Sequence, residues 1–126
     1  MEAWERLEKD VTNRTGGRAT PGSGRFNTKG DVRTDSLYIE CKWRTESGKP
    51  KAIPGDWCRT AESNTRINGL TPVIAYQAYR DEAPTPVRYF CRLPDATLFD
   101  FVELGPEGWC EISAESVQEY CREERL

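Results

Sequence analysis

The stretch GDVRTDSLYIECKWR, residues 30–44, decides the fold because polar and apolar side chains alternate along it with the period of a β-strand. The pattern predicts strands over residues 31–34 and 37–43, with Asp35-Ser36 as a two-residue turn between them. In a hairpin of that register Asp31 lies directly opposite Glu40, with the two Cβ atoms about 5 Å apart.

The two faces of the second predicted strand differ in chemistry. Its odd-numbered residues are apolar and form the face expected in the core: Leu37, Ile39, Cys41 and Trp43. Its even-numbered residues include Glu40 and Lys42, which we expect side by side on the face away from the core. Arg44 follows on that same face.

Two opposed carboxylates repel one another, and a divalent cation between them relieves that repulsion. Mg²⁺ or Mn²⁺ binds one or two protein carboxylates together with water and phosphate oxygens, which is the set that Asp31 and Glu40 offer. The Lys42 ammonium, about 6.6 Å along the strand from Glu40, is placed to orient a metal-bound water and to stabilise charge on a phosphate. The structural alternative is an amphipathic hairpin on which Glu40 and Lys42 form a surface ion pair.

The remaining elements are predicted around this hairpin. Helices are expected over residues 2–14, 56–68 and 113–125, with Asp56 and Ser113 as caps of the last two. Strands are expected over residues 72–79, 87–93 and 110–112, the first of them central because its start is continuously apolar. A short helical segment is expected from Pro94 through FDFVEL, residues 99–104. The order predicts a single α/β domain over residues 1–126, a mixed sheet flanked by helices.

Composition narrows the classes of function. The chain of 126 residues contains no histidine, which excludes Ser-His-Asp and Cys-His nucleophiles and histidine general bases. Its five cysteines are widely spaced, so we expect reduced core thiols, Cys41 and Cys91 among them, and neither a zinc site nor a disulfide framework. No apolar run is long enough for a membrane span, and the acidic start MEAWERLEKD lacks the apolar region of a signal peptide. We therefore expect a cytoplasmic protein.

Charge is distributed unevenly, although the formal net charge is only −3. Basic residues outnumber acidic ones in the first half of the chain, and the carboxyl half is strongly acidic. Within residues 14–33 the only acid among several basic side chains is Asp31, an arrangement typical of a nucleic-acid backbone site. A solvated charged surface is the alternative interpretation.

The motif Asp-x₈-Glu-x-Lys on a hairpin, here Asp31, Glu40 and Lys42, resembles that of the PD-(D/E)XK, or restriction-endonuclease-like, nucleases. Among these, the chain is most similar to archaeal and phage-type Holliday junction resolvases. The further matches are Glu5-Arg6-Leu7, Arg18, Gly22-Ser23-Gly24, Lys29-Gly30-Asp31-Val32, Ile39-Glu40-Cys41-Lys42, Trp57 and Gly69-Leu70-Thr71-Pro72-Val73-Ile74. The likeness spans residues 4–104, and the acidic carboxyl half departs from the family.

The resemblance implies a role for each matching residue. Asp31, Glu40 and the Cys41 carbonyl would hold Mg²⁺ or Mn²⁺, and Lys42 would be the catalytic lysine. Glu5 would complete the site through water or metal, with a solvated first-turn glutamate as the alternative. Ser23 would contact the scissile phosphate, with a plain turn residue as the alternative. Backbone phosphates of DNA are expected near Arg18, Arg25, Lys29 and Arg44.

These features favour a metal-dependent DNA endonuclease in which a metal-activated water attacks the phosphodiester, and the resemblance implies 5′-phosphate and 3′-hydroxyl ends. The resemblance further implies a Holliday junction resolvase, acting as a homodimer because one chain carries one site and a four-way junction needs two nicks. The Trp57 helix and the aromatic run from Tyr89-Phe90 to Phe99-Phe101 are candidate interface material. Two alternatives stay open, a restriction-like or nicking nuclease on other DNA and a non-catalytic DNA-binding or assembly module of the same fold.

Overall fold

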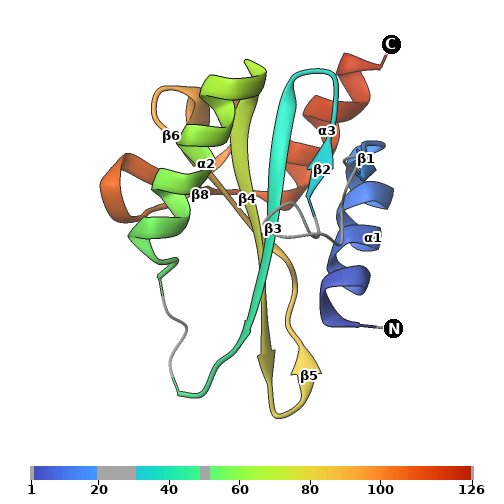
Figure 1. Cartoon of the computed structure of the whole chain (residues 1–126), viewed down its shortest axis with the longest axis vertical. Coiled ribbons are helices and arrows are strands. Elements are labelled where there is room, and N and C mark those ends of the chain that lie inside the picture. Colours follow the sequence, from blue (N-terminus) through green and yellow to red (C-terminus); the bar gives the residue numbers. More distant parts are fainter. Residues whose placement is uncertain (1, 20–30, 49–51, 126) are drawn as a thin grey trace.

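The computed structural model describes residues 2–19, 31–48 and 52–125, without the side chains of residues 64–68. Over these residues the fold is mixed α/β, with an eight-stranded, mostly antiparallel sheet flanked by three α-helices (Figure 1). The helices are α1 (Ala3–Thr15), α2 (Gly55–Asn68) and α3 (Ala114–Glu124). The strands are β1 (Arg18–Ala19), β2 (Val32–Arg33), β3 (Leu37–Thr45), β4 (Thr71–Arg80), β5 (Ala83–Pro84), β6 (Arg88–Arg92), β7 (Phe101–Leu104) and β8 (Trp109–Ile112). Their order in the sheet is β1-β2-β3-β4-β6-β8-β7, with β5 pairing with β4.

The hairpin of β2 and β3 has the register that the sequence predicts. Val32 pairs with Ile39, and the backbone N–H of Thr34 donates to the carbonyl of Leu37 at 2.9 Å. Asp35-Ser36 is therefore the two-residue turn, and Asp31, immediately before β2, lies at the level of Glu40. The expected central strand is also confirmed, because β4 lies between β3 and β6.

Strands β3 and β4 are parallel, with Leu37 opposite Thr71 and Glu40 opposite Ile74. A parallel pair needs a crossover connection, and α2 supplies it. The helices α1 and α3 cover one face of the sheet and α2 covers the other (Figure 1). Each face thus has its own apolar cluster, one including Leu7, Ile39 and Val117, the other including Ala61 and Ile74.

Local signals set the helix ends. Helix α1 ends at Gly16, whose φ of 72° is in the left-handed region that glycine adopts without a steric penalty. Ser113 caps α3 as predicted, since its hydroxyl accepts a hydrogen bond from the backbone N–H of Ser116 at 3.0 Å. The prediction that Asp56 caps α2 is wrong, because that helix begins at Gly55 and Asp56 lies inside its first turn.

Three further expectations are corrected. The segment FDFVEL is not helical, since a 3₁₀ turn covers Asp95–Leu98 and Phe101–Leu104 form the edge strand β7 paired with β8. The short strands β1 and β5 were not expected, because neither lies in a segment with an alternating pattern. Trp43, expected in the core, is 44% exposed, since it lies near the end of β3, where its ring packs edge-on against Tyr79 with 5.8 Å between the ring centres.

The cysteines agree with the expectation from composition. All five cysteines are buried and free, so Cys41 and Cys91 are core thiols as predicted. In the part of the chain that the structure describes, no helix combines the length and apolar character needed to cross a bilayer.

Candidate active site

The hairpin brings two carboxylates face to face in the interior. Asp31 is 3% exposed and Glu40 is 2% exposed. The sequence placed Glu40 on the face away from the core, and this expectation is wrong. Its partner in the parallel register is Ile74, which belongs to the apolar cluster beneath α2, so both faces of β3 are covered at this level.

Hydrogen bonds and burial together set the state of Asp31. The Tyr38 hydroxyl donates to Asp31 Oδ2 at 2.8 Å, and the backbone N–H of Cys41 also donates to this carboxylate. Burial raises the pKa of Asp31 to about 7, and the negative charge of Glu40 contributes in the same direction. The Tyr38 hydroxyl, the Lys42 ammonium and the Cys41 N–H act in the opposite direction. The effect of burial is therefore the largest, and the pKa of Asp31 lies well above the ordinary range of a carboxyl group.

Lys42 lies at the exposed rim of this pair. Its Nζ is 4.0 Å from Glu40 Oε2, and its side chain is 31% exposed whereas that of Glu40 is 3% exposed. The ammonium also lies 5.9 Å from the centre of the Trp57 ring on α2, within range of a cation–π interaction. Glu40 and Lys42 therefore lie on the same face of β3, as predicted. The Lys42 ammonium reaches solvent, whereas the carboxylates of Asp31 and Glu40 are buried.

Arg44 follows Lys42 on this face, as predicted, and belongs to a polar cluster with buried Glu46. The Arg44 Nε donates to the Tyr76 hydroxyl at 2.9 Å and lies 3.4 Å from Glu46 Oε2, while its NH2 donates to the Ala52 carbonyl at 3.0 Å. Tyr76 donates to Glu46, and Arg80 NH2 lies 2.9 Å from Glu46 Oε1. Burial raises the pKa of Glu46, but these donors outweigh it and the net shift is downward. Sequence reasoning missed this cluster, although Arg44 and Glu46 share a face at strand spacing.

Glu5 has a local role in α1. Its Oε1 accepts a hydrogen bond from the backbone N–H of Glu2 at 3.0 Å, which completes a capping box at the start of the helix. Leu7 and Val11 of α1 pack with Ile39 and Cys41, so the helix covers the face of β3 opposite Glu40. The structure thus assigns Glu5 a capping function, and its role in catalysis stays a prediction.

The residues expected to contact DNA are only partly described. Arg18 is exposed on β1, and Arg44 is 28% exposed within the Glu46 cluster. Ser23, Arg25 and Lys29 lie outside the described residues. The sequence placed Tyr38 on the face of Glu40 and Arg33 among the basic residues around Asp31 but gave neither a role, and the hairpin register was the signal that could have done so.

The donor set of the pair fits a hard cation in its chemistry. Over the described ranges no group of three or more His, Cys, Asp or Glu side chains gathers as a metal site. Asp31 and Glu40 provide two carboxylates beside backbone carbonyls. Mg²⁺ keeps several waters and uses one or two carboxylates, whereas a structural zinc site would need four side-chain ligands.

Comparison of the chain with protein-family models, with curated proteins and with solved structures finds no match in any of the three. The residues of the site therefore carry the functional argument.

Proposed function

We propose that this protein is a metal-dependent DNA endonuclease with a restriction-endonuclease-like fold, acting in the cytoplasm. The observation that carries the proposal is the buried pair of Asp31 and Glu40, opposed across a hairpin, with Lys42 on the same face. The spacing of these three residues is the one that resembles the PD-(D/E)XK motif.

The burial of the pair argues against a purely structural role. Removing two carboxylates from water is unfavourable, and their mutual repulsion adds to the cost. The Lys42 ammonium at 4.0 Å offsets this only in part, because it is partly solvated. Buried ionisable groups that influence one another in this way are concentrated at functional sites, where a bound ligand can add a further favourable interaction. A non-catalytic DNA-binding module has no need for opposed acids.

Each residue has a task in the proposed reaction. A divalent cation, when bound, polarises water and a phosphate oxygen. Asp31, Glu40 and the Cys41 carbonyl would hold it, and Tyr38 fixes the orientation of the Asp31 carboxylate through Oδ2. Lys42 presents its ammonium at the solvent side, where a phosphodiester could approach and where positive charge stabilises the negative charge that develops on hydrolysis.

As the finer proposal, the substrate is branched DNA and the active unit a homodimer with a site in each chain. Burial narrows the surface available for self-association. Of the candidate aromatic run, Tyr89, Phe90 and Phe99 are buried, so they serve the core. The exposed apolar side chains of the edge strand β7, Phe101, Val102 and Leu104, offer a surface for pairing. A nicking or restriction-like nuclease on other DNA is the alternative.

The decisive experiment is cleavage with Mg²⁺ of linear, nicked, flapped and four-way DNA side by side, together with the mass of the protein in solution. Asp31→Asn and Glu40→Gln should each abolish cleavage. Glu119→Gln, a change at an exposed carboxylate on α3, is the matched control and should cut like wild type. Full activity of Asp31→Asn would refute the site. If the protein is a monomer and cuts plain duplex as efficiently as four-way junctions, the resolvase proposal is excluded and the nuclease proposal still holds.

A further inference from the structure

Two arginines face one another at the edge of the sheet, next to the carboxylate pair. Strand β1 pairs with β2 so that Arg18 is directly opposite Arg33, and both residues are exposed. Like charges directly opposed across strands are destabilising. None of the ion pairs between described residues involves either guanidinium. The pair is therefore a concentration of positive charge that an anion would relieve.

The close approach of the two strands depends on Gly17. A Cβ atom at this position would lie 2.7 Å from the Arg33 carbonyl oxygen and 2.8 Å from Val32 Cγ1. Because a larger residue would force β1 away from β2, the glycine keeps Arg18 at the position opposite Arg33. The juxtaposition of the arginines is thus built into the backbone and does not arise from two free surface side chains.

Register places the arginines on the face of the proposed active site. Arg33 follows Asp31 by two residues, so the two side chains share a face about 6.6 Å apart along the chain. Arg33 is also paired with Tyr38, whose hydroxyl holds Asp31. Val32, between them, points into the apolar cluster beneath α1 and α3. The carboxylate pair and the arginine pair are therefore adjacent levels of the same hairpin face.

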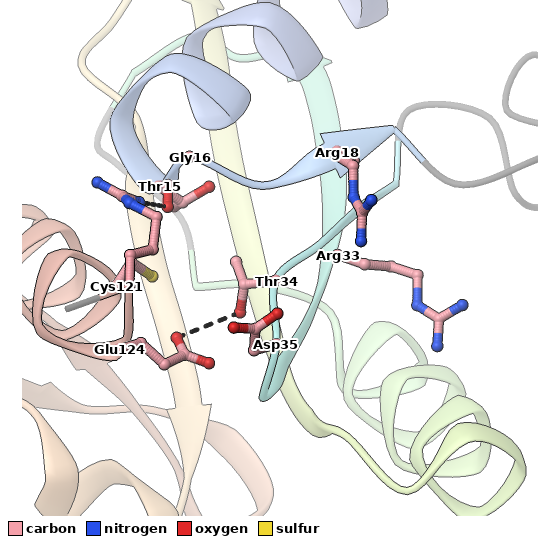
Figure 2. A pocket seen from close by; sticks show the side chains of 9 residues that line it. Thr15, Gly16, Arg18, Arg33, Thr34, Asp35, Cys121 and Glu124 are labelled. Atoms are coloured by element: carbon pink, nitrogen blue, oxygen red, sulfur yellow. Dashed lines mark hydrogen bonds between the residues drawn. The ribbon is translucent and has the colours of Figure 1, made fainter.

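The space around the arginines is open. Both line a pocket of about 300 Å³ and a neighbouring hollow of about 500 Å³. Figure 2 shows the lining of the first pocket, in which Arg18 and Arg33 are joined by Glu124, bonded to Thr34 at 3.5 Å, and Arg125 also lines this pocket. Asp35 is the acid that lines both spaces, so basic groups outnumber acidic ones in the hollow. An anion can reach the two guanidinium groups from solvent.

We propose that Arg18 and Arg33 together bind a backbone phosphate of the DNA substrate, next to the scissile phosphate that a cation bound by Asp31 and Glu40 would contact. The planar guanidinium group matches phosphate oxygens in a bidentate geometry, and two of them opposed across a strand pair form a clamp. This inference rests on the proposed function, which makes the anion a phosphodiester. The arginine pair then fixes the register of the DNA strand over the carboxylates, since phosphate contacts position a nucleic acid without reading its sequence.

The test is the binding of labelled duplex and four-way DNA by fluorescence anisotropy without divalent metal, so that no cleavage occurs, over about 50 to 200 mM salt. Arg33→Ala should weaken binding and reduce the slope of log K against log salt by about one. Arg33→Glu should weaken binding further, because it replaces a positive charge with a negative one, and its thermal unfolding shows whether the variant is folded. Arg122→Ala, at an exposed residue of α3 on the other face, is the control and should leave the slope unchanged.

The outcomes separate this inference from the nuclease proposal. The phosphate clamp is supported if Arg33→Glu is folded and has a reduced salt slope while the slope of Arg122→Ala is unchanged. Wild-type slopes in both Arg33 variants would overturn it, as would equal losses in the Arg122 control or the absence of DNA binding by wild type at low salt. If the slopes of the Arg33 variants are unchanged, or if the Arg122 control loses as much binding, the nuclease proposal still holds provided that cleavage requires Asp31. Cleavage that does not require Asp31 would refute the nuclease site whatever the arginines do.

Discussion

The Tyr38 hydroxyl lies 2.8 Å from Asp31 Oδ2 and donates a hydrogen bond to it diagonally across the β2–β3 hairpin. This hydrogen bond engages Oδ2 and thereby fixes the direction in which the second oxygen, Oδ1, points. Burial and the adjacent Asp31 both raise the pKa of Tyr38, so its proton remains on the hydroxyl at neutral pH. Tyr38 is thus a positioning residue for the acid on which the proposed metal site depends.

Tyr38→Phe should therefore impair metal binding more than DNA binding. Partners of metal ligands typically contribute about 10–100-fold in metal affinity, and a lost hydrogen bond to a buried carboxylate costs about 1–3 kcal/mol of stability. Calorimetric titration with Mn²⁺ and urea unfolding measure the two effects. Tyr120→Phe removes a hydroxyl that instead contacts Ser36 at 3.1 Å, and it should leave metal affinity unchanged. Equal affinities in wild type and Tyr38→Phe would contradict the positioning role.

The raised pKa of Asp31 predicts a specific dependence of stability on pH. Between its ordinary value of 3.8 and about 7, the folded protein holds a proton that the unfolded chain has lost. The contribution of Asp31 to the free energy of unfolding therefore falls as pH rises through this interval. Asp31→Asn should be more stable than wild type near pH 8, and this difference in stability should disappear as the pH approaches 3.8. Urea unfolding of both proteins without metal measures the difference, and a difference independent of pH would contradict the assignment.

Lys42→Ala should reduce turnover far more than DNA binding, because the ammonium acts on charge that develops during the reaction. The change in stability should be small, about 0.5 kcal/mol, since the side chain is partly solvated and its ion pair with Glu40 is long at 4.0 Å. Steady-state kinetics and anisotropy separate kcat from binding. Lys9→Ala, at an exposed lysine of α1, is the matched control. Unaltered turnover in Lys42→Ala would favour the surface ion-pair interpretation.

Arg44→Ala should lower stability by about 1–3 kcal/mol, because Glu46 loses one of its cations and the Tyr76 hydroxyl loses a donor. Its effect on the salt dependence of DNA binding should be smaller than that of Arg33→Ala, since the Arg44 guanidinium is already engaged by Glu46, Tyr76 and Ala52. Urea unfolding and anisotropy test both statements. The control is Arg59→Ala, which breaks an exposed pair with Glu107 and should cost little. If Arg44→Ala instead reduces the slope of log K against log salt by one and leaves stability unchanged, Arg44 contacts DNA as the sequence predicts.

The sequence by itself determined the elements whose signals are local. Alternation and a two-residue turn defined the β2–β3 hairpin and its register, so the opposition of Asp31 and Glu40 was predictable before any packing was known. Glycine at position 16 and serine at position 113 defined helix ends for the same reason, since caps depend only on neighbouring backbone groups.

Only the tertiary structure decided which faces and edges are covered. Glu40 is buried because β4 and the apolar cluster beneath α2 cover a face that the alternation marked as polar. Trp43, near the end of β3, is 44% exposed on a face that the alternation marked as apolar. Phe101–Leu104 became a strand only because β8 was available to pair with it, and Arg18 came to face Arg33 through a pairing with no sequence period. The alternation of polar and apolar residues shows which side chains share a face of a strand. The free energy of burying that face depends on elements that are distant in the chain. Their contacts determine which part of the proposed site is buried and which part meets solvent.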